Sequence, residues 1–342
     1  MAPRIEEGVR ISLAGSEVEF DCAVDDTILR AGLRAGLGLP YECSVGSCGT
    51  CRVDLVSGEV ATVWQAAPGL TERDRQRGRR LACQSRPLGP CMIKARLTPE
   101  TVPPVLPRRQ SALLVGSRAL TRDMREFVFR TSGAADFVPG QYALIEFGSE
   151  IGPRAYSMSS LPSAEGDWRF VIRQVPGGKG SGALFAATAG ARFEMDGPYG
   201  LAYLRATERD IICVAGGSGL SPMLSIVHAA AHDPRFADRT IHLFYGGRTP
   251  ADLCAEAEIK SLPGFGTRIH HVAAVSDAAA AREPYARPIG FIHTIVEEAF
   301  GDRLKEHEIY FSGPPAMGDA MQKMLVLGRK VPVGQIHFDR FY

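Results

Sequence analysis

The sequence has no marked excess of charge of either sign and no long apolar run. Its 342 residues include 39 Lys and Arg against 38 Asp and Glu, a formal net charge of +1. This balance gives no overall field that would attract nucleic acid or an anionic membrane. No apolar run approaches the length that spans a bilayer, and residues 1–7 lack the apolar core of a secretory signal. We therefore expect a cytoplasmic protein without nucleic-acid or membrane partners.

The eight cysteines do not suggest a disulfide framework, because cytoplasmic thiols stay reduced. Cys43, Cys48 and Cys51 form C-x4-C-x2-C, and Cys83 follows at a distance. This is the spacing of plant-type 2Fe–2S clusters, and the small loop residues let the backbone wrap closely and donate N–H groups to the sulfurs. A structural zinc site is the alternative, but zinc sites more often pair two C-x2-C units and here there is one. The remaining cysteines are expected to be buried small hydrophobes: Cys22, Cys91, Cys213 and Cys254.

The clearest boundary in the chain is a proline-rich segment, residues 99–109. Proline removes backbone donors and holds the chain extended, so we interpret this segment as a semi-rigid linker. Before it lies a first block, residues 1–98. This block has short strands expected at 9–13 and 17–20 and a helical stretch at 27–37.

The second block, residues 110–205, has evenly spaced short strands without long helices, which predicts a small antiparallel barrel. The expected strands include 124–129, 142–147 and 168–175. Taken alone, the motif Arg154-Ala-Tyr156-Ser157 is weak evidence for a binding site, since an exposed arginine beside a core tyrosine would explain it. Gly178-Lys-Gly-Ser181 follows a strand at the point where a helix can begin. That geometry binds a pyrophosphate through backbone amides and a hydroxyl.

The third block, residues 206–342, alternates apolar runs with helical segments, which predicts a doubly wound parallel sheet. Gly216–Gly219 lies between the first strand and the first helix, for which Ser221 and Pro222 are expected to supply the cap and the first turn. Gly313-Pro314-Pro315 ends a later strand at the same sheet edge. The first turn lacks the G-x-G-x-x-G fingerprint, and purely structural glycines are the alternative. Two such turns at carboxyl ends of strands favour a dinucleotide site.

These motifs, taken together, resemble the ferredoxin–NADP reductase superfamily in its form with an N-terminal ferredoxin, the reductases of multicomponent aromatic oxygenases. Residues 139–142 (P-G-Q-Y) and the motifs above follow the family order over nearly the whole chain. The ending, residues 337–342, and Tyr41-Glu-Cys43 most resemble reductases of toluene monooxygenases, which serve a di-iron hydroxylase. The resemblance implies a β-grasp 2Fe–2S ferredoxin domain, an antiparallel β-barrel FAD domain, and a doubly wound parallel-sheet NAD domain whose tail returns to the flavin.

The resemblance also implies roles for single residues. Arg154 would pair with the flavin pyrophosphate, Tyr156 would lie against the isoalloxazine, and Ser157 would approach its N5. A terminal aromatic residue would cover the flavin face that nicotinamide must displace, with Phe338, Phe341 and Tyr342 as candidates. Where the family often has cysteine before G-P-P this chain has Ser312, so no catalytic part is assigned there. The full expected sets are Arg154, Ala155, Tyr156, Ser157, Val171, Ile172, Arg173, Gly178, Lys179, Gly180 and Ser181 for FAD, and Gly216, Gly217, Ser218, Gly219, Tyr245, Gly246, Arg248, Gly313, Pro314 and Pro315 for NADH.

One electron path connects these parts. NADH delivers two electrons as hydride, a 2Fe–2S cluster accepts one at a time, and a flavin can hold one or two, so FAD stands between them. The chain has no Cys-x-His pair for a Rieske centre and no Glu-x-x-His for a di-iron bundle, so oxygen activation is expected on another polypeptide. We expect a monomeric reductase that serves a di-iron aromatic monooxygenase, directly or through a small ferredoxin. A Rieske dioxygenase is the alternative partner, and a stand-alone reductase or a zinc-stabilised interaction module is the alternative function.

Two charge features bear on specificity. No second basic residue closely follows Arg248, and Asp252 would repel a 2′-phosphate, so NADH is expected rather than NADPH.

Six arginines also crowd the sequence around Cys83. They can be interpreted as a solvated polar face or as a docking surface for an acidic partner. A docking role predicts that turnover with the partner falls steeply with salt. These arginines are Arg73, Arg75, Arg77, Arg79, Arg80 and Arg86.

Overall fold

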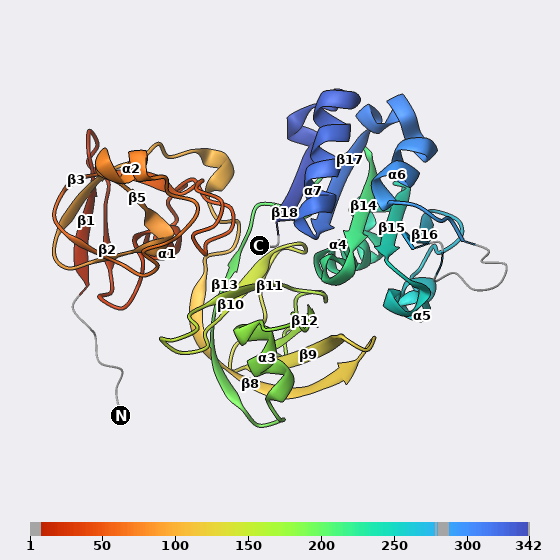
Figure 1. Cartoon of the computed structure of the whole chain (residues 1–342), viewed down its shortest axis with the longest axis horizontal. Coiled ribbons are helices and arrows are strands. Elements are labelled where there is room, and N and C mark those ends of the chain that lie inside the picture. Colours follow the sequence, from red (N-terminus) through yellow and green to blue (C-terminus); the bar gives the residue numbers. More distant parts are fainter. Residues whose placement is uncertain (1–7, 278, 280–286, 341–342) are drawn as a thin grey trace. The chain divides into compact units, whose positions relative to one another are not determined.

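The computed structural model describes residues 8–277, 279 and 287–340. The chain forms two compact units, each described here by itself (Figure 1). One unit is the chain up to Arg109 together with Asp196–Tyr199, and the other is Gln110–Met195 together with the chain from Gly200 onward. No helix among the described residues is long and apolar enough to cross a membrane.

The first unit is built on a mixed five-stranded sheet in the order β2-β1-β7-β3-β5. β1 pairs in parallel with β7, while the β1–β2, β3–β5 and β3–β7 pairs are antiparallel. Helix α1 begins after Thr27, whose hydroxyl accepts the N–H of Arg30 and so satisfies a free donor of the first turn. The elements are β1 Val9–Leu13, β2 Glu19–Cys22, α1 Ile28–Arg34, β3 Arg52–Ser57, β4 Val60–Thr62, α2 Glu72–Gln76, β5 Arg79–Leu81, β6 Ser85–Pro87 and β7 Cys91–Lys94.

The segment expected to be a linker is partly structured. Pro99–Thr101 forms a 3-10 turn, and β8 already begins at Arg108. Strand β8 starts a six-stranded sheet in the order β11-β10-β13-β8-β9-β12, and every pairing in it with a resolved register is antiparallel. A bridge between Met158 and Phe170 links the two end strands, which nearly closes the barrel. The elements are β8 Arg108–Ala119, β9 Met124–Thr131, β10 Tyr142–Ile145, β11 Arg154–Ser157, β12 Asp167–Arg173, α3 Lys179–Ala186 and β13 Arg192–Tyr199.

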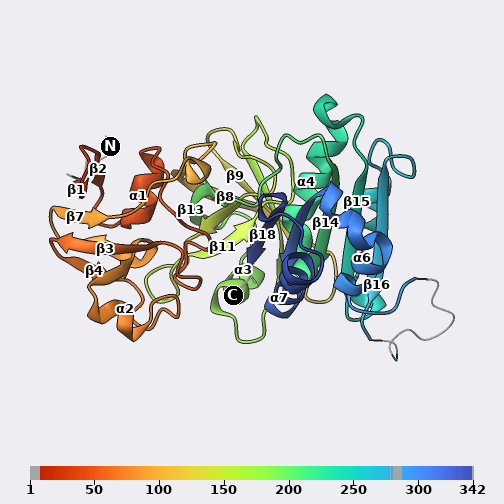
Figure 2. The same cartoon turned by 90° about the horizontal axis from the view of Figure 1, so that it is seen from above.

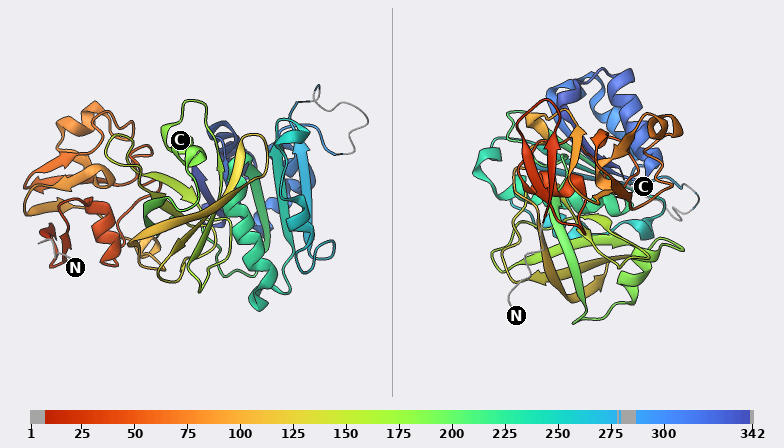
Figure 3. Two further views of the ribbon diagram at one scale, coloured as in Figure 1. Left: turned by 90° about the horizontal axis from the view of Figure 1, so that it is seen from below. Right: turned by 90° about the vertical axis from the view of Figure 1, so that its left-hand side faces the viewer.

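Aromatic side chains fill the barrel. Phe127, Phe129 and Phe170 are fully buried, and Trp168 is 1% exposed. The strands, coloured yellow to light green, curve around one another in both views of Figure 3. Their buried side chains form one hydrophobic cluster. The predicted antiparallel barrel is therefore confirmed.

The third block is a five-stranded sheet with every strand parallel, in the order β16-β15-β14-β17-β18. Figure 2 shows β14, β15 and β16 side by side. Alternate residues of β14 face opposite layers: Ile211 and Cys213 pack with α4, while Ile212 and Val214 pack with α6 and α7. The doubly wound prediction is thus confirmed. The elements are β14 Asp210–Gly216, α4 Leu220–His232, β15 Ile241–Gly247, α5 Glu256–Lys260, β16 Ile269–Val275, α6 Ile292–Phe300, β17 His307–Gly313, α7 Pro315–Gln322 and β18 Ile336–Arg340.

Strand β13 runs on through Asp196–Tyr199. The expected start of the first helix of the parallel sheet needs correction. Helix α4 begins at Leu220 with Gly219 as its cap, so Ser221 lies inside the first turn rather than capping it. Pro222 does occupy the first turn, where its missing N–H costs no hydrogen bond. The hydroxyl of Ser221 is then free for partners outside the helix.

Candidate functional site

The four cysteines of the spacing pattern converge in the first unit. Cys43, Cys51 and Cys83 are buried, and Cys48 is half-buried. The thiols lie two by two: Sγ of Cys51 is 3.2 Å from Sγ of Cys83, and Cys43 shares a side-chain hydrogen bond with Cys48. This grouping suits a cluster in which each of two irons takes two thiolates. The donor set fits a 2Fe–2S centre.

The loop backbone already points donors at the sulfurs. The N–H groups of Ser47 and Cys48 lie 3.3 and 3.4 Å from Sγ of Cys43, and the N–H of Thr50 lies 3.5 Å from Sγ of Cys48. Gly46 and Gly49 adopt positive φ angles of 91° and 80°. A side chain at Gly49 would also collide with the carbonyl oxygen of Gly69, at 2.5 Å from its Cβ. The wrapping predicted for this loop therefore depends on glycine at this position.

One thiol of each pair is poised to lose its proton. A hydrogen bond from Cys43 lowers the pKa of Cys48 to about 5, and a hydrogen bond from Cys51 lowers the pKa of Cys83. The partner thiol in each pair has a raised pKa because it keeps the shared proton. Thiolates are the form that binds iron, so one thiol of each pair already favours the form of a ligand.

In the second unit, the barrel brings Arg154-Ala-Tyr156-Ser157 against the start of α3. A Cβ on Gly180 would lie 2.8 Å from Cγ of Arg154 and 3.3 Å from the hydroxyl oxygen of Tyr156. Gly178 caps α3, so the N–H groups of Lys179, Gly180 and Ser181 are the free donors of its first turn. Such donors and the nearby exposed guanidinium of Arg154 have the chemistry of a diphosphate cradle. Burial raises the pKa of Tyr156 to about 12, which keeps its phenol neutral.

Ser181 is placed differently from the expectation. Its hydroxyl accepts the N–H of Val175 at 3.1 Å and lies 3.4 Å from the carbonyl oxygen of Gly178, so it braces the turn before α3. It is 6% exposed. A phosphate at this helix would therefore meet the backbone N–H of Ser181 more readily than its side chain.

The two glycine turns of the parallel sheet meet at one edge. β14 and β17 are neighbours, with Ala215 opposite Ser312, so both turns follow adjacent carboxyl ends. A Cβ on Gly219 would lie 2.0 Å from the carbonyl oxygen of Ser312, and a Cβ on Gly216 would lie 2.6 Å from Sδ of Met317. At Gly219, where the collision is with backbone, only glycine permits this approach. The crevice outside the carboxyl ends of such strands is where open parallel sheets bind nucleotides.

The comparisons with known proteins agree with this geometry. Residues 11–88 match the 2Fe-2S iron-sulfur cluster binding domain, residues 111–203 the oxidoreductase FAD-binding domain, and residues 213–323 the oxidoreductase NAD-binding domain. The chain is 40% identical to the ferredoxin–NAD(P)(+) reductase CarAd of Metapseudomonas resinovorans, over 94% of this chain and 96% of that protein. The chain belongs to the ferredoxin–NAD(P)+ reductase components of multicomponent oxygenases.

Other reductase components are similar over nearly their whole length. The ferredoxin–NAD(+) reductase component of an alkene monooxygenase system from Xanthobacter autotrophicus is 38% identical, over 94% of this chain and 97% of its own. The xylene/toluene monooxygenase electron transfer component XylA of Pseudomonas putida is 33% identical, over 97% and 93%. The solved ferredoxin reductase in carbazole 1,9a-dioxygenase is 37% identical and superposes with a TM-score of 0.88 over 98% of both chains. The family thus carries a 2Fe–2S cluster and FAD and uses NAD(P)H.

Of the C-terminal aromatic residues expected to cover the flavin, Phe338 lies within the described residues. It is part of β18, and its ring stacks on that of Phe311 at 4.9 Å between centroids and 7° between planes. Its place over the flavin stays a prediction. Phe341 and Tyr342 lie outside the described residues.

The two side chains expected beside the adenosine of the nucleotide, Tyr245 and Arg248, are placed differently. Tyr245 is fully buried and its hydroxyl donates to the carbonyl oxygen of Asp252 at 3.1 Å, so it supports the sheet edge and does not suit direct contact with nucleotide. Arg248 is exposed, and its Nε lies 3.5 Å from Oδ2 of Asp252. The same carboxylate accepts the N–H groups of Arg248 and Thr249, and these bonds and the nearby guanidinium hold its pKa below the ordinary range. The positive charge of Arg248 is therefore already paired with the carboxylate of Asp252.

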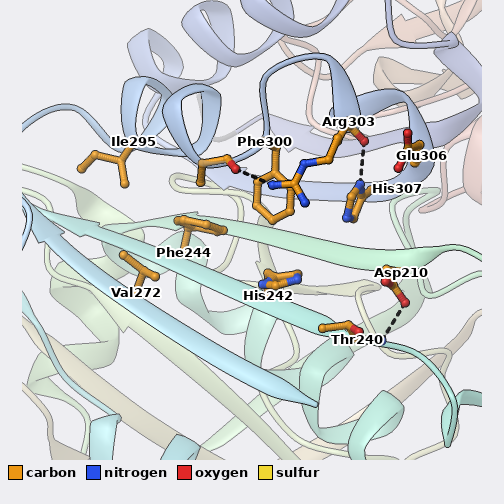
Figure 4. A pocket seen from close by; sticks show the side chains of 11 residues that line it. Asp210, Thr240, His242, Phe244, Val272, Ile295, Phe300, Arg303, Glu306 and His307 are labelled. Atoms are coloured by element: carbon orange, nitrogen blue, oxygen red, sulfur yellow. Dashed lines mark hydrogen bonds between the residues drawn. The ribbon is translucent and has the colours of Figure 1, made fainter. Parts of the chain in front are cut away.

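A cavity of about 550 Å³ opens at the opposite edge of the parallel sheet (Figure 4). Its lining comes from the amino-terminal ends of the strands, where His242, His307 and Asp210 lie, and from the end of α6 at Phe300. The glycine turns follow the other ends of the same strands. This cavity is therefore separate from the nucleotide edge and is no part of the cofactor site.

Sequence reasoning missed the side chains that join the two halves of the second unit. Ser221 and Ser225 bond the carbonyl oxygens of Ser157 and Ser160 at 2.7 and 2.6 Å. Both are serines on the buried side of a helix, at i and i+4. Polar residues on an apolar helix face were the available signal, because a buried hydroxyl needs a partner.

Proposed function

We propose that this reductase component takes hydride from NADH on FAD and passes electrons singly, through its 2Fe–2S cluster, to a small separate ferredoxin that serves an oxygenase. The observation that carries the proposal is the presence of three cofactor sites in one chain: a two-by-two thiol set, a diphosphate cradle and a nucleotide edge. FAD supplies the change from paired to single electrons. A ferredoxin acceptor is favoured because the relatives at 40% and 38% identity are both named as ferredoxin reductases.

For the oxygenase at the end of the path, our first candidate is a di-iron aromatic monooxygenase. It is supported by the C-terminal motif resemblance and by relatives named for alkene and xylene/toluene monooxygenases. The second candidate is a Rieske ring-hydroxylating dioxygenase, because a solved relative at 37% identity belongs to carbazole 1,9a-dioxygenase. Both candidates need the same electrons from the same cluster, so the choice does not change what this chain does.

Within the chain we propose these roles. Arg154 and the first amides of α3 bind the flavin diphosphate, Tyr156 lies against the isoalloxazine and Ser157 faces its reactive edge. Val171, Ile172 and Arg173 flank the flavin from β12. Gly216–Gly219 and Gly313–Pro315 receive the nicotinamide nucleotide, with Gly246 and Arg248 beside its adenosine, and Tyr342 covers the flavin until nicotinamide enters. The corresponding domain limits are 1–98, 110–205 and 206–342.

We also propose NADH as the physiological donor and the cytoplasm as the location. The carboxylate of Asp252 beside Arg248 opposes a 2′-phosphate, which favours NADH. Eight unpaired cysteines suit a reducing compartment. Comparing kcat/KM for NADH and NADPH tests the first proposal, and a preference for NADPH would contradict it.

The purified holoprotein tests the main proposal. Anaerobic addition of NADH should bleach the flavin and cluster absorbance, and a catalytic amount of holoprotein should then reduce a small 2Fe–2S ferredoxin. Adding an oxygenase, with and without that ferredoxin, shows which protein takes the electrons. Equal oxygenase turnover without the ferredoxin would contradict the proposed acceptor, and a colourless protein would contradict the redox function itself.

A further inference from the structure

The first unit exposes a large aromatic residue beside the cysteine loop. Trp64 follows β4 and is 43% exposed. A Cβ on Gly46 of the loop would lie 3.2 Å from Cε3 of the Trp64 ring and 3.1 Å from the side chain of Gln84. Nε2 of Gln84 lies 3.7 Å from Sγ of Cys83. One loop glycine and one buried glutamine thus lie between an exposed indole and the thiol set.

A cavity of about 320 Å³ opens beside Trp64. Buried apolar residues, among them Leu70 and Leu81, line it together with Arg75 and Arg80. Nη2 of Arg75 donates to the carbonyl oxygen of Gln65 at 2.7 Å, which holds the guanidinium in place. The cavity therefore offers an apolar contact bordered by fixed positive charge.

The positive charge around this cavity is only partly neutralised. Asp74 pairs with Arg52 and Arg79, Asp54 pairs with Arg79, and Glu72 lies 3.8 Å from Arg75. In the part of the chain that the structure describes, no carboxylate lies within ion-pair distance of four further arginines: Arg73, Arg77, Arg80 and Arg86.

Trp64, Arg75 and Arg80 all line this one cavity. Trp and Arg are the residue types that most often dominate binding energy at protein interfaces. Unmatched charge of one sign also speeds the encounter with a partner of the other sign. Trp64 and Arg80 bring both features to one cavity beside the cluster loop.

We propose that the Trp64 face, made of Trp64, Arg75 and Arg80, is the docking surface for an acidic protein acceptor, a small ferredoxin with carboxylates around its cluster. This inference rests on the proposed function. In each docking event one electron leaves the reduced cluster of this chain and reduces the oxidised cluster of the acceptor. Two events discharge the two electrons of one NADH, which leaves NAD+ and one proton.

The experiment uses the full holoprotein and two probe acceptors of opposite charge: an acidic plant-type ferredoxin, and cytochrome c, whose surface is basic. Trp64→Ala and the double variant Arg75→Glu/Arg80→Glu should each lower kcat/KM for the ferredoxin about tenfold. The double variant should leave cytochrome c reduction equal or faster. Salt should slow the wild-type reaction with ferredoxin and have little effect on the double variant.

Matched controls come from the same unit. Val24→Ala changes an apolar residue that is 53% exposed, and Arg96→Glu reverses an exposed arginine; neither lines the cavity. Both should behave as wild type with ferredoxin. If they lower its reduction as much as the test variants do, the effect is general charge or surface loss and the proposal is wrong.

The remaining outcomes separate the two proposals. If the wild type reduces its own cluster with NADH but reduces no ferredoxin, the proposed function fails. If the wild type reduces ferredoxin and the test variants do so equally well, the Trp64 face is not the docking surface. If a test variant reduces its own cluster more slowly than the wild type in stopped-flow, the Trp64 face serves a step within the chain. That result also overturns the docking proposal. If Trp64→Ala loses its cluster absorbance, its ferredoxin rate cannot be used. The same measurement on Trp64→Phe and on the double arginine variant then decides whether the Trp64 face is the docking surface.

Discussion

The hydroxyl of Ser221 donates a hydrogen bond to the carbonyl oxygen of Ser157 at 2.7 Å. The same oxygen of Ser221 accepts the N–H of Val171 at 3.0 Å. Ser157 ends strand β11, Val171 lies in β12, and Ser221 is the second residue of the helix that follows the nucleotide turn. One hydroxyl, 1% exposed, therefore fixes that helix against two strands of the barrel.

Ser221→Ala should lower both stability and the rate of flavin reduction. It leaves a buried N–H and a buried carbonyl without this partner, which costs about 1–3 kcal/mol. Because Ser157 and the glycine turn are proposed to hold the two reacting groups, a small shift between them should slow hydride transfer by about tenfold. Chemical denaturation and stopped-flow measurement of flavin bleaching by NADH check the two effects.

Ser225→Ala is the matched control for that prediction. Ser225 lies one turn further along α4 and bonds a single carbonyl oxygen, that of Ser160, at 2.6 Å. Its loss should cost less stability and leave flavin reduction nearly unchanged. Equal effects of the two variants would show that Ser221 has no special part in alignment.

Gly180→Ala should weaken FAD binding by about tenfold or more. The added Cβ would lie 2.8 Å from Cγ of Arg154, so Arg154 or the first turn of α3 must move. Gly182→Ala tests the same helix without the collision, since nothing lies within 4 Å of its added Cβ. Replacing a helical glycine there should stabilise the helix by up to about 1 kcal/mol. The ratio of flavin to protein absorbance, and FAD titration of the stripped protein, measure the effect. Equal FAD retention in both variants would contradict the cradle.

Much of this architecture was predictable because its signals are local. The thiol set follows from the spacing of Cys43, Cys48 and Cys51 with Cys83, and β1 has the predicted bounds. A helix was expected after the glycine turn, but the start of α4 was misplaced because Ser221 resembles a cap. The role of Ser221 depends on its hydrogen bond to Ser157, which lies 64 residues away in sequence. Phe338 shows the same limit: its aromatic character was plain, but stacking on Phe311 depends on a strand pairing that no local pattern shows.

Cys83→Ser should abolish reduction of ferredoxin while leaving the flavin reaction intact. Cys83 is the ligand most distant in sequence, and its loss removes one thiolate of the Cys51–Cys83 pair. The protein should lose its cluster absorbance but still reduce ferricyanide with NADH at the flavin. Cys254→Ser, at a half-buried thiol outside the set, should keep both activities. Retained ferredoxin reduction in Cys83→Ser would exclude Cys83 as a ligand.

The histidines at the amino-terminal edge of the parallel sheet should make the second unit sensitive to acid. The ring of His242 stacks on that of His270 at 5.1 Å and meets the edge of Phe300 at 5.0 Å. Burial, and then the neighbouring His270 and His307, lower the pKa of His242 from 6.5 to about 4. Burial also lowers the pKa of His271. These imidazoles are therefore neutral in the folded protein at neutral pH.

A lowered pKa sets the sign of the effect. Between about pH 6.5 and 4 the unfolded chain binds the proton at His242 and the folded chain does not, so stability falls as the pH falls through this range. His242→Phe keeps an aromatic ring and removes the titration, so its Tm should fall less than that of the wild type between pH 6.5 and 4.5. His232→Gln, at the exposed end of α4, controls for losing a histidine. Acid damage to the cluster affects all three proteins alike, so only the difference between them measures His242. Parallel Tm curves for wild type and His242→Phe would mean that the imidazole takes up its proton without cost to the fold.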